Sequence, residues 1–327
     1  MNVLVCGGAG YIGSNMTATL AAGGHSPVVF DNLSKGHKAA IADAVFVRGD
    51  LADYDLLVRT LRDHRIDAVM HFAAFIEVGE SVEQPLKYYQ NNFCNTHTLL
   101  RAMAEAQVEK FVFSSTAATY GMPDTIPITE DVAKAPINPY GESKWAVERL
   151  CHFLSEAGQI RYAAFRYFNA CGAGHNATLG EDHRPESHLI PLIIQAAMGK
   201  RDAIRVYGTD YPTPDGTCVR DYVHVEDLCQ AHLLALDKLD GACELVYNLG
   251  NGKGCSVREV IDTVRGVSGR DVKVIETGRR AGDPPILTAD ASKAERELGW
   301  TRRFGELRQI VETAWTWHSN HPDGYPE

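Results

Sequence analysis

The chain has 327 residues, enough for a large hydrophobic core, and its 45% apolar and 23% charged residues are typical of a globular protein. The formal charge of −10, without a long basic run, excludes a general nucleic-acid binder but not a protein that holds a phosphorylated small molecule. No apolar run approaches the roughly 18 residues of a membrane helix, so we expect no membrane partner. The first apolar segment has no basic flank, and the eight scattered cysteines form no Cys-x-x-Cys motif, which predicts a cytoplasmic protein with reduced thiols.

The first predicted elements are a strand at residues 3–6 and a helix at residues 11–22, joined by a glycine turn. Gly7, Gly10 and Gly13 thus lie between a strand and a helix, which is the context of a dinucleotide-binding turn. Without side chains there, backbone amides can approach a pyrophosphate at the positive end of the helix. A plain tight turn is the alternative interpretation.

Asp31 ends the next apolar segment, which is a predicted strand at residues 26–30. An acidic residue roughly 20 positions after the glycines is placed to accept a hydrogen bond from a ribose 2′-hydroxyl. The same charge repels a 2′-phosphate, so the pattern favours NAD over NADP. An aspartate that starts a turn after a strand is the alternative.

Strand patterns then alternate with amphipathic helix patterns as far as residue 170. Further strands are predicted at 44–48, 68–72, 110–115 and 161–167, and further helices at 54–64, 87–106 and 140–157. This alternation predicts an α/β fold with a doubly wound parallel sheet of the Rossmann type. We therefore expect an NAD-binding domain at residues 1–170.

From residue 171 onwards the loops are longer and richer in Gly, Pro and charged residues. Helix patterns remain at 189–198, 225–236, 257–267 and 304–318. We expect residues 171–327 to form mainly a smaller mixed α/β lobe that binds substrate, with some segments returning to the first domain. Long loops of this kind are usually functional.

Tyr140 and Lys144 lie four residues apart at the start of a predicted helix, so their side chains share one face. A free tyrosine titrates near ~10, and a neighbouring cation is expected to lower its pKa. Such a pair suits proton transfer during hydroxyl–carbonyl interconversion. Thr116, at the end of the preceding strand, offers a hydroxyl beside them. A chance Tyr-x-x-x-Lys and a capping threonine are the alternatives.

Taken together, these motifs resemble the extended short-chain dehydrogenase/reductase family and, within it, the UDP-glucose 4-epimerases. The resemblance runs nearly end to end. Its motifs are residues 7–14, 31–34, 49–51, 71–74, 78–81, 88–92, 140–144, 166–169, 207–213, 215–222, 247–250, 279–284, 289–294 and 321–326. The segments at 211–222 and 321–326 are more particular to the epimerases than the glycine turn is.

The resemblance implies an NAD site and a site for a UDP-sugar. Cofactor-binding residues would be Gly7, Gly10, Tyr11, Ile12, Gly13, Asp31, Asn32, Leu33, Ser34, Lys35, Gly36, Asp50, Leu51, Phe72, Ala73, Ala74, Phe75, Ile76, Asn92, Tyr140, Lys144 and Phe168. Substrate-binding residues would be Thr116, Tyr140, Asn169, His188, Leu189, Arg205, Val206, Tyr207, Arg220, Arg280, Asp283 and Leu287. Arginine is the natural bidentate partner for a diphosphate.

The implied reaction interconverts UDP-glucose and UDP-galactose by transient oxidation at sugar C4. Tyr140 would be the acid/base, Lys144 would tune it, Thr116 would position or relay the proton, and NAD would be recycled. The resemblance also implies a homodimer. No metal site is expected, because no second pair of ligands supports the Cys229 and His232 spacing.

Four residues depart from well-known bacterial members of the family: Thr116, Ile76, His188 and Leu287. Leu287 stands where some members have a tyrosine that narrows the sugar pocket, so an N-acetylated sugar could fit. Alternatives are therefore a 4-epimerase of UDP-N-acetylglucosamine, UDP-xylose or UDP-arabinose, or a UDP-uronate. A dehydratase or decarboxylase is disfavoured, since alanines rather than an acidic residue follow Thr116. A non-catalytic NAD sensor would lack the Tyr–Lys pair.

Overall fold

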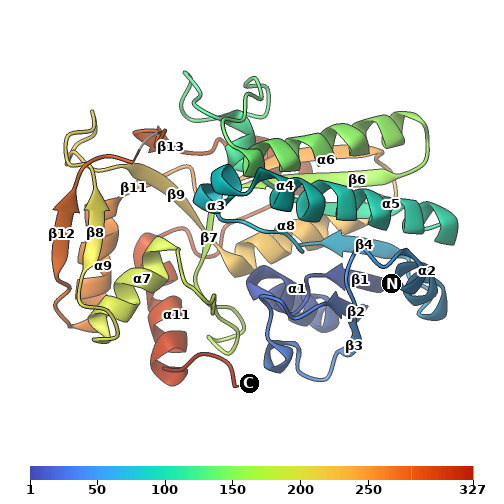
Figure 1. Ribbon diagram of the computed structural model, residues 1–327, viewed down its shortest axis with the longest axis horizontal. Helices are drawn as coiled ribbons and strands as arrows, with labels where there is room; N and C mark the ends of the chain where they lie inside the picture. The colour runs from blue at the N-terminus through green and yellow to red at the C-terminus, as the bar shows by residue number, and fades with distance from the viewer. Residues whose placement is uncertain (281, 327) are drawn as a thin grey trace.

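The computed structural model describes residues 1–280 and 282–326, and its largest element is a parallel sheet (Figure 1). Within these residues the sheet has seven strands in the order β10-β6-β5-β4-β1-β2-β3. Its strands are β1 (Asn2–Cys6), β2 (Ser26–Asp31), β3 (Val45–Arg48), β4 (Ala68–His71), β5 (Lys110–Thr116), β6 (Arg161–Tyr167) and β10 (Glu244–Leu249). The predicted doubly wound α/β class is confirmed.

Helices cover both faces of this sheet, and each face has its own apolar core. The helices are α1 (Tyr11–Ala22), α2 (Tyr54–Asp63), α5 (Asn95–Ala106), α6 (Pro139–Glu156), α8 (Val225–Lys238) and α10 (Ser292–Leu298). One core contains residues of α2, α5 and α6, and the other contains residues of α1, α8 and α10. The two hydrophobic faces explain why the strands read as nearly continuous apolar runs.

Part of the chain predicted as one long helix is three consecutive elements. They are the short helix α4 (Pro85–Tyr88), a π-helical segment, Tyr89–Cys94, and α5; another short helix, α3 (Val78–Glu83), precedes them. The prediction of one α-helix at 87–106 is therefore wrong for residues 89–94, which are π-helical. π-helical turns are rare and widen the helix locally, so an apolar period of 3.6 cannot reveal them.

In the part of the chain that the structure describes, the second lobe has two small sheets and three helices, seen at the left of Figure 1. Its strands are β7 (Asn169–Cys171), β8 (Ile204–Tyr207), β9 (Val219–His224), β11 (Gly254–Ser256), β12 (Val274–Thr277) and β13 (Ile286–Leu287). Its helices are α7 (Leu189–Ala197), α9 (Val257–Ser268) and α11 (Leu307–Asn320), and all three contribute to a third apolar core.

The two halves of the sequence are interleaved. Strand β10 pairs with β6 at one edge of the main sheet, and α8 and α10 pack on that sheet. The sheet order changes direction at β1, because the chain runs outward to β3 and then returns to place β4 on the other side of β1. Ligands bind at such switch points, beyond the carboxyl ends of the strands.

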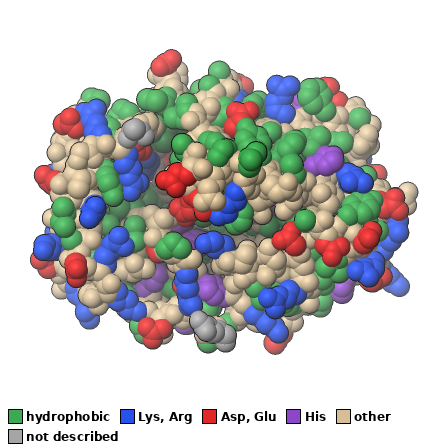
Figure 2. Space-filling view, viewed as in Figure 1, with side chains coloured by type: hydrophobic (Ala, Val, Ile, Leu, Met, Phe, Trp, Pro, Cys, Tyr) green, Lys and Arg blue, Asp and Glu red, His purple; other side chains and the backbone are tan. Residues whose placement is uncertain are grey.

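The surface seen in Figure 2 is hollowed near its centre, between the smaller lobe and the main sheet, with acidic and basic side chains around the hollow. None of the helices in the described residues is long and apolar enough to cross a membrane.

Candidate active site

The glycine turn after β1 lies at the sheet's switch point and leaves no room for side chains. Gly7 has a φ of +77°, and a Cβ there would lie 2.5 Å from the backbone nitrogen of Ala73, which follows β4. A Cβ on Gly13 would lie 2.0 Å from the Gly7 carbonyl oxygen. Gly10 caps α1 without a side chain, so the first amides of that helix stay available to an anion. The turn therefore fits the pyrophosphate of a dinucleotide.

Asp31, at the end of β2, is buried against this turn. Its carboxylate accepts hydrogen bonds from the amides of Ala9 (3.0 Å) and Leu33 (2.8 Å). Burial raises its pKa, and these two bonds oppose that shift. A carboxylate has about four acceptor positions, so it retains capacity for a ribose hydroxyl. Nearby, the Asn32 amide donates to Asp50 (2.8 Å), which joins the two predicted adenosine-binding loops.

The loop after β4 is held by Asn92, which is fully buried. The Asn92 side chain accepts from the Phe75 amide (2.9 Å) and donates to the Phe75 carbonyl (3.0 Å). Its role is therefore to fix the loop that carries the predicted cofactor residues 72–76. Ile76 follows in the same loop and is exposed.

The predicted catalytic residues are brought together by β5 and α6. Asn138 caps α6 by accepting from the Gly141 amide (2.8 Å), and Pro139 is suited to the first helical position. This start places Tyr140 in the first turn and Lys144 one turn later. The Lys144 ammonium donates to the Ser114 carbonyl (2.7 Å), two residues before Thr116. Thr116 lies close enough to Tyr140 to lower its pKa.

The expected lowering of the Tyr140 pKa is wrong. Burial raises the pKa of Tyr140, the Thr116 hydroxyl opposes this shift, and Glu77 adds to it. Burial also lowers the pKa of Lys144 to about 7, although Glu148 opposes this shift. Both groups are desolvated, and desolvation disfavours the charged form of each. A sequence gives the spacing of the pair but not its burial.

A buried polar network behind α6 was not found by sequence reasoning. The Arg166 guanidinium binds Glu148 (2.6 Å) and donates to the Tyr120 hydroxyl (2.8 Å), which donates to Asn248 (2.7 Å). Glu148 also accepts from Ser115, on β5. This network ties α6 to β5, β6 and β10. It fixes the helix that carries Tyr140 and Lys144. The only sign of this network in the sequence is that Glu148 follows Lys144 by four residues.

The second lobe gathers predicted substrate residues on β9 and β13. Arg220 pairs with Asp283 (2.5 Å), and Leu287 is the register partner of Arg220 in the parallel β9–β13 pair. Asn169, on the neighbouring strand β7, donates to the Asp221 carbonyl (2.8 Å). Arg220, Asp283 and Leu287 therefore lie close together. A diphosphate and a sugar could be held there.

A second group comes from β8. Arg280 lies over the Tyr207 ring, 3.9 Å from its centroid, and Arg205 also lies close enough to lower the Tyr207 pKa. The side chain of Val206, between them in sequence, is buried in the apolar core of the lobe. Alternation along the strand thus leaves Val206 only its backbone for contact with a ligand.

His188 and Leu189 lie where the loop at 172–188 enters α7. The His188 ring contacts Glu181 and Glu186 rather than standing free. Two other predicted cofactor residues, Tyr11 and Ile12, lie in the first turn of α1. The rest are in the loops after β2, β3, β4 and β6, and they are Ser34, Lys35, Gly36, Leu51, Phe72, Ala74 and Phe168.

Comparisons with known proteins agree with this geometry. Residues 3–250 match the NAD dependent epimerase/dehydratase family. The UDP-glucose 4-epimerase of Halalkalibacterium halodurans is 51% identical over 327 residues, covering 99% of this chain and 98% of that protein. A crystal structure of a UDP-glucose 4-epimerase matches with a TM-score of 0.98 and 50% identity over 100% of both chains. The Brucella ovis UDP-glucose 4-epimerase, in complex with NAD, gives 0.94 and 48% over 97% of this chain and 98% of that one. The chain therefore belongs to the NAD dependent epimerase/dehydratase family, among the UDP-glucose 4-epimerases.

Proposed function

We propose that this protein interconverts UDP-glucose and UDP-galactose by oxidation and reduction at sugar C4. The observation that carries the proposal is the arrangement of Tyr140, Lys144 and Thr116 at the end of β5, beside the loop that Asn92 fixes. Relatives across the full length of the chain carry the same activity in their names.

The glycine turn and the residues around Asp31 fit NAD, because the turn excludes side chains and the carboxylate disfavours a 2′-phosphate. Bound NAD would supply the hydride acceptor at sugar C4, and its positively charged ring would favour the Tyr140 phenolate. Tyr140 then takes the proton of the 4-hydroxyl and returns it after the sugar has turned its other face. Thr116 orients the hydroxyl, and Lys144 supplies a second positive centre.

The UDP-sugar is proposed to bind between the glycine turn and the second lobe. Arg220 and Arg280 would hold the diphosphate, since guanidinium groups pair with phosphate oxygens in a bidentate manner. Leu287, beside Arg220, would face the sugar. A side chain of this volume supports the alternative that an N-acetylated sugar is also accepted.

We also propose a homodimer formed through the outer faces of α5 and α6. On α6 the Phe153 side chain is 55% exposed, and it lies beside a hollow that Trp145 and Val246 also line. Apolar groups of this kind favour a two-fold interface. A cytoplasmic location is supported by the cysteines, all eight of which are free.

The decisive experiment incubates the purified protein with UDP-galactose and no added cofactor. Sugar products are followed by NMR and cofactor reduction by near-UV absorbance. We expect UDP-glucose to appear without accumulation of NADH. Absence of product even after NAD is added would overturn the proposal, and NADH that grows in step with an oxidised product would instead indicate a net dehydrogenase.

A further inference from the structure

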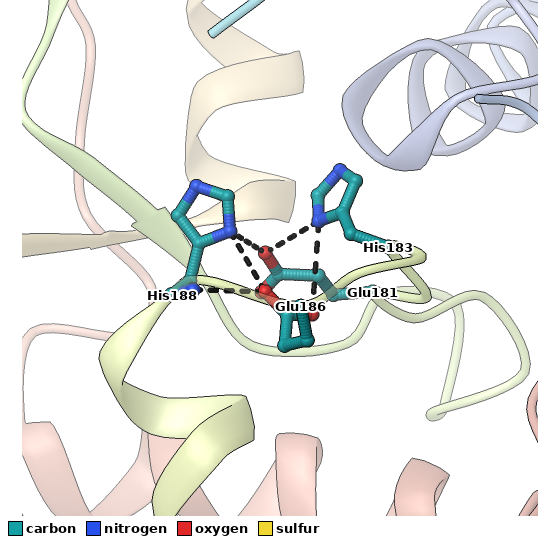
Figure 3. Close-up of side chains that lie close together, drawn as sticks. All are labelled: Glu181, His183, Glu186 and His188. Atoms are coloured by element: carbon teal, nitrogen blue, oxygen red, sulfur yellow. Dashed lines mark hydrogen bonds and ion pairs between the residues drawn. The ribbon is translucent and has the colours of Figure 1, made fainter. Parts of the chain in front are cut away.

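We propose that Glu181, His183, Glu186 and His188 form a binding site for one divalent metal ion of the zinc type. These four side chains come from one loop segment before α7 and converge on a common point (Figure 3). From the sequence we expect no metal, because no second pair of ligands supports the Cys229 and His232 spacing. His188 is also one of the predicted substrate-binding residues, but zinc binding can be measured without any assay of the epimerase activity.

The four candidate ligand atoms lie close enough to one another to bind a single metal ion. One atom from each of the four residues lies within 4.8 Å of all the others. Nδ1 of His188 is 2.8 Å from Glu181 Oε1 and 3.0 Å from Glu186 Oε1. Nδ1 of His183 is 3.1 Å from Glu181 Oε1 and 3.7 Å from Glu186 Oε2. Two imidazole nitrogens and two carboxylate oxygens are a suitable tetrahedral donor set for zinc.

One of these atoms makes ion-pair contacts but no hydrogen bond. Nδ1 of His183 is buried and lies 3.1 Å from Glu181 Oε1, yet among the described residues no group makes a hydrogen bond with it. Buried polar atoms in native proteins nearly always have a partner. A cation at the centre of the group would bind this nitrogen directly, without the angular demands of a hydrogen bond.

The charges of the cluster are also compatible with a bound cation. The side chains of Glu181 and Glu186 are each only 4% exposed, and the cationic groups that contact them in the described residues are the two histidines. Two buried carboxylates are costly unless they are neutralised. A divalent ion bound by two neutral imidazoles would neutralise both carboxylates without requiring either histidine to be protonated.

The loop is held from outside the cluster, so the ligands are preorganised. The Tyr325 hydroxyl accepts from the Gly180 amide (3.0 Å), and the Tyr325 amide donates to Asp182 (3.0 Å). Ser187 donates to Glu77 (2.8 Å), which belongs to the loop after β4. A metal bound here would stiffen a segment that joins the C-terminal tail, the second lobe and the cofactor loop.

Coordination would also fix the tautomer of His188. Its Nδ1 faces the carboxylates in Figure 3, so with a metal on Nδ1 the ring proton stays on Nε2. His188 would then present a hydrogen-bond donor on the side away from the cluster.

The test uses the full chain after treatment with a chelator and titration with ZnCl₂ alone in a calorimeter. We expect one zinc ion per chain with a submicromolar Kd. His183→Gln should weaken binding by at least about 10-fold. The matched control is His175→Gln, in the same loop but outside the cluster, with its ring near the Asn15 carbonyl (3.2 Å). Equal affinity of wild type and His183→Gln, or no binding by wild type, would overturn the proposal.

X-ray absorption of the zinc-loaded wild type provides a test that does not depend on the folding of a variant. We expect nitrogen and oxygen ligands at about 2.0–2.1 Å with the scattering of two imidazoles. A sulfur shell at about 2.3 Å would place the ion on cysteines and overturn the proposal.

Discussion

The catalytic region and the sugar-binding region are built in different ways. Tyr140, Lys144 and Thr116 come from one strand and the next helix, and the Glu148–Arg166 network holds that helix against the sheet. The proposed sugar site instead draws on β7, β9 and β13 and on contacts between residues far apart in the chain, such as the Arg220–Asp283 pair, whose members are 63 positions apart. The chemistry therefore depends on local helical spacing, whereas recognition depends on pairing between distant segments.

The largest effect is expected in the catalytic region, for a residue whose proposed role is proton transfer alone. Tyr140→Phe should lower kcat by about 10²–10⁴-fold, because it removes the proton-transfer group. Bound NAD should be retained and KM should change little, since the ring keeps its volume. Steady-state kinetics and NAD released on denaturation measure these quantities, with Tyr54→Phe on α2 as the control. A kcat within a factor of ten of wild type would exclude Tyr140 as the acid/base.

The second prediction removes the support of the catalytic helix. Glu148→Gln leaves the buried Arg166 charge without its partner, which should reduce the free energy of unfolding by about 3–5 kcal/mol. Urea denaturation measures this loss. Glu156→Gln is the matched control on the same helix, where the carboxylate is exposed, and should change stability by less than about 0.5 kcal/mol. Similar stabilities for the two variants would show that the Glu148–Arg166 network does not hold α6 in place.

Acid should destabilise both regions through buried neutral histidines. Burial lowers the pKa of His71 and His224 to about 3 and that of His232 to about 4. The unfolded chain takes up these protons near pH 6.5 and the folded chain does not, so this stability is complete above pH 6.5. It falls as the pH decreases, by about 1.4 kcal/mol per pH unit for each group, until the folded pKa is reached.

Urea unfolding between pH 7 and pH 4.5 tests this dependence on pH, with histidine NMR signals to assign the protons. A free energy of unfolding that stays constant over this range would contradict it. His71 lies in β4 and His224 ends β9, so the NMR signals also show whether the two regions lose stability together.

A change confined to recognition should leave the chemistry intact. Arg220→Lys keeps the charge but loses the planar fork, so the KM for UDP-galactose should rise by about 10-fold while kcat is nearly retained. Arg258→Lys, in an exposed pair with Glu276, is the control and should be silent. A fall in kcat without a change in KM would show that the two regions are not separable in this way.

The smallest expected effect concerns sugar choice. Leu287→Tyr should reduce the kcat/KM for UDP-N-acetylglucosamine by about 10-fold relative to UDP-glucose, because a larger ring fills the space for the N-acetyl group. Competition assays with both sugars measure the ratio. If wild type does not turn over UDP-N-acetylglucosamine at all, the volume argument for Leu287 fails.

Periodicity found most of the sheet but missed the elements that join the two halves. The helix at 11–22 and the strand at 161–167 have the predicted bounds, since each depends on a local pattern and its own turn residues. β10 and the short strands β7, β11 and β13 carry little alternation of their own. They become strands because their backbones pair with the edge of a sheet that is already formed. A local sequence pattern cannot predict such pairing.

The sequence by itself determined the glycine turn, the acidic residue that follows it, and the Tyr140–Lys144 pair, because each depends on spacing within one turn or one strand–helix unit. Only the tertiary structure decided the raised pKa of Tyr140, the buried Glu148–Arg166 pair and the inward side chain of Val206. It also decided the convergence of Glu181, His183, Glu186 and His188. The physical reason is that burial and the distances between loop side chains follow from packing against distant segments, while helical and strand periods are fixed by the backbone itself.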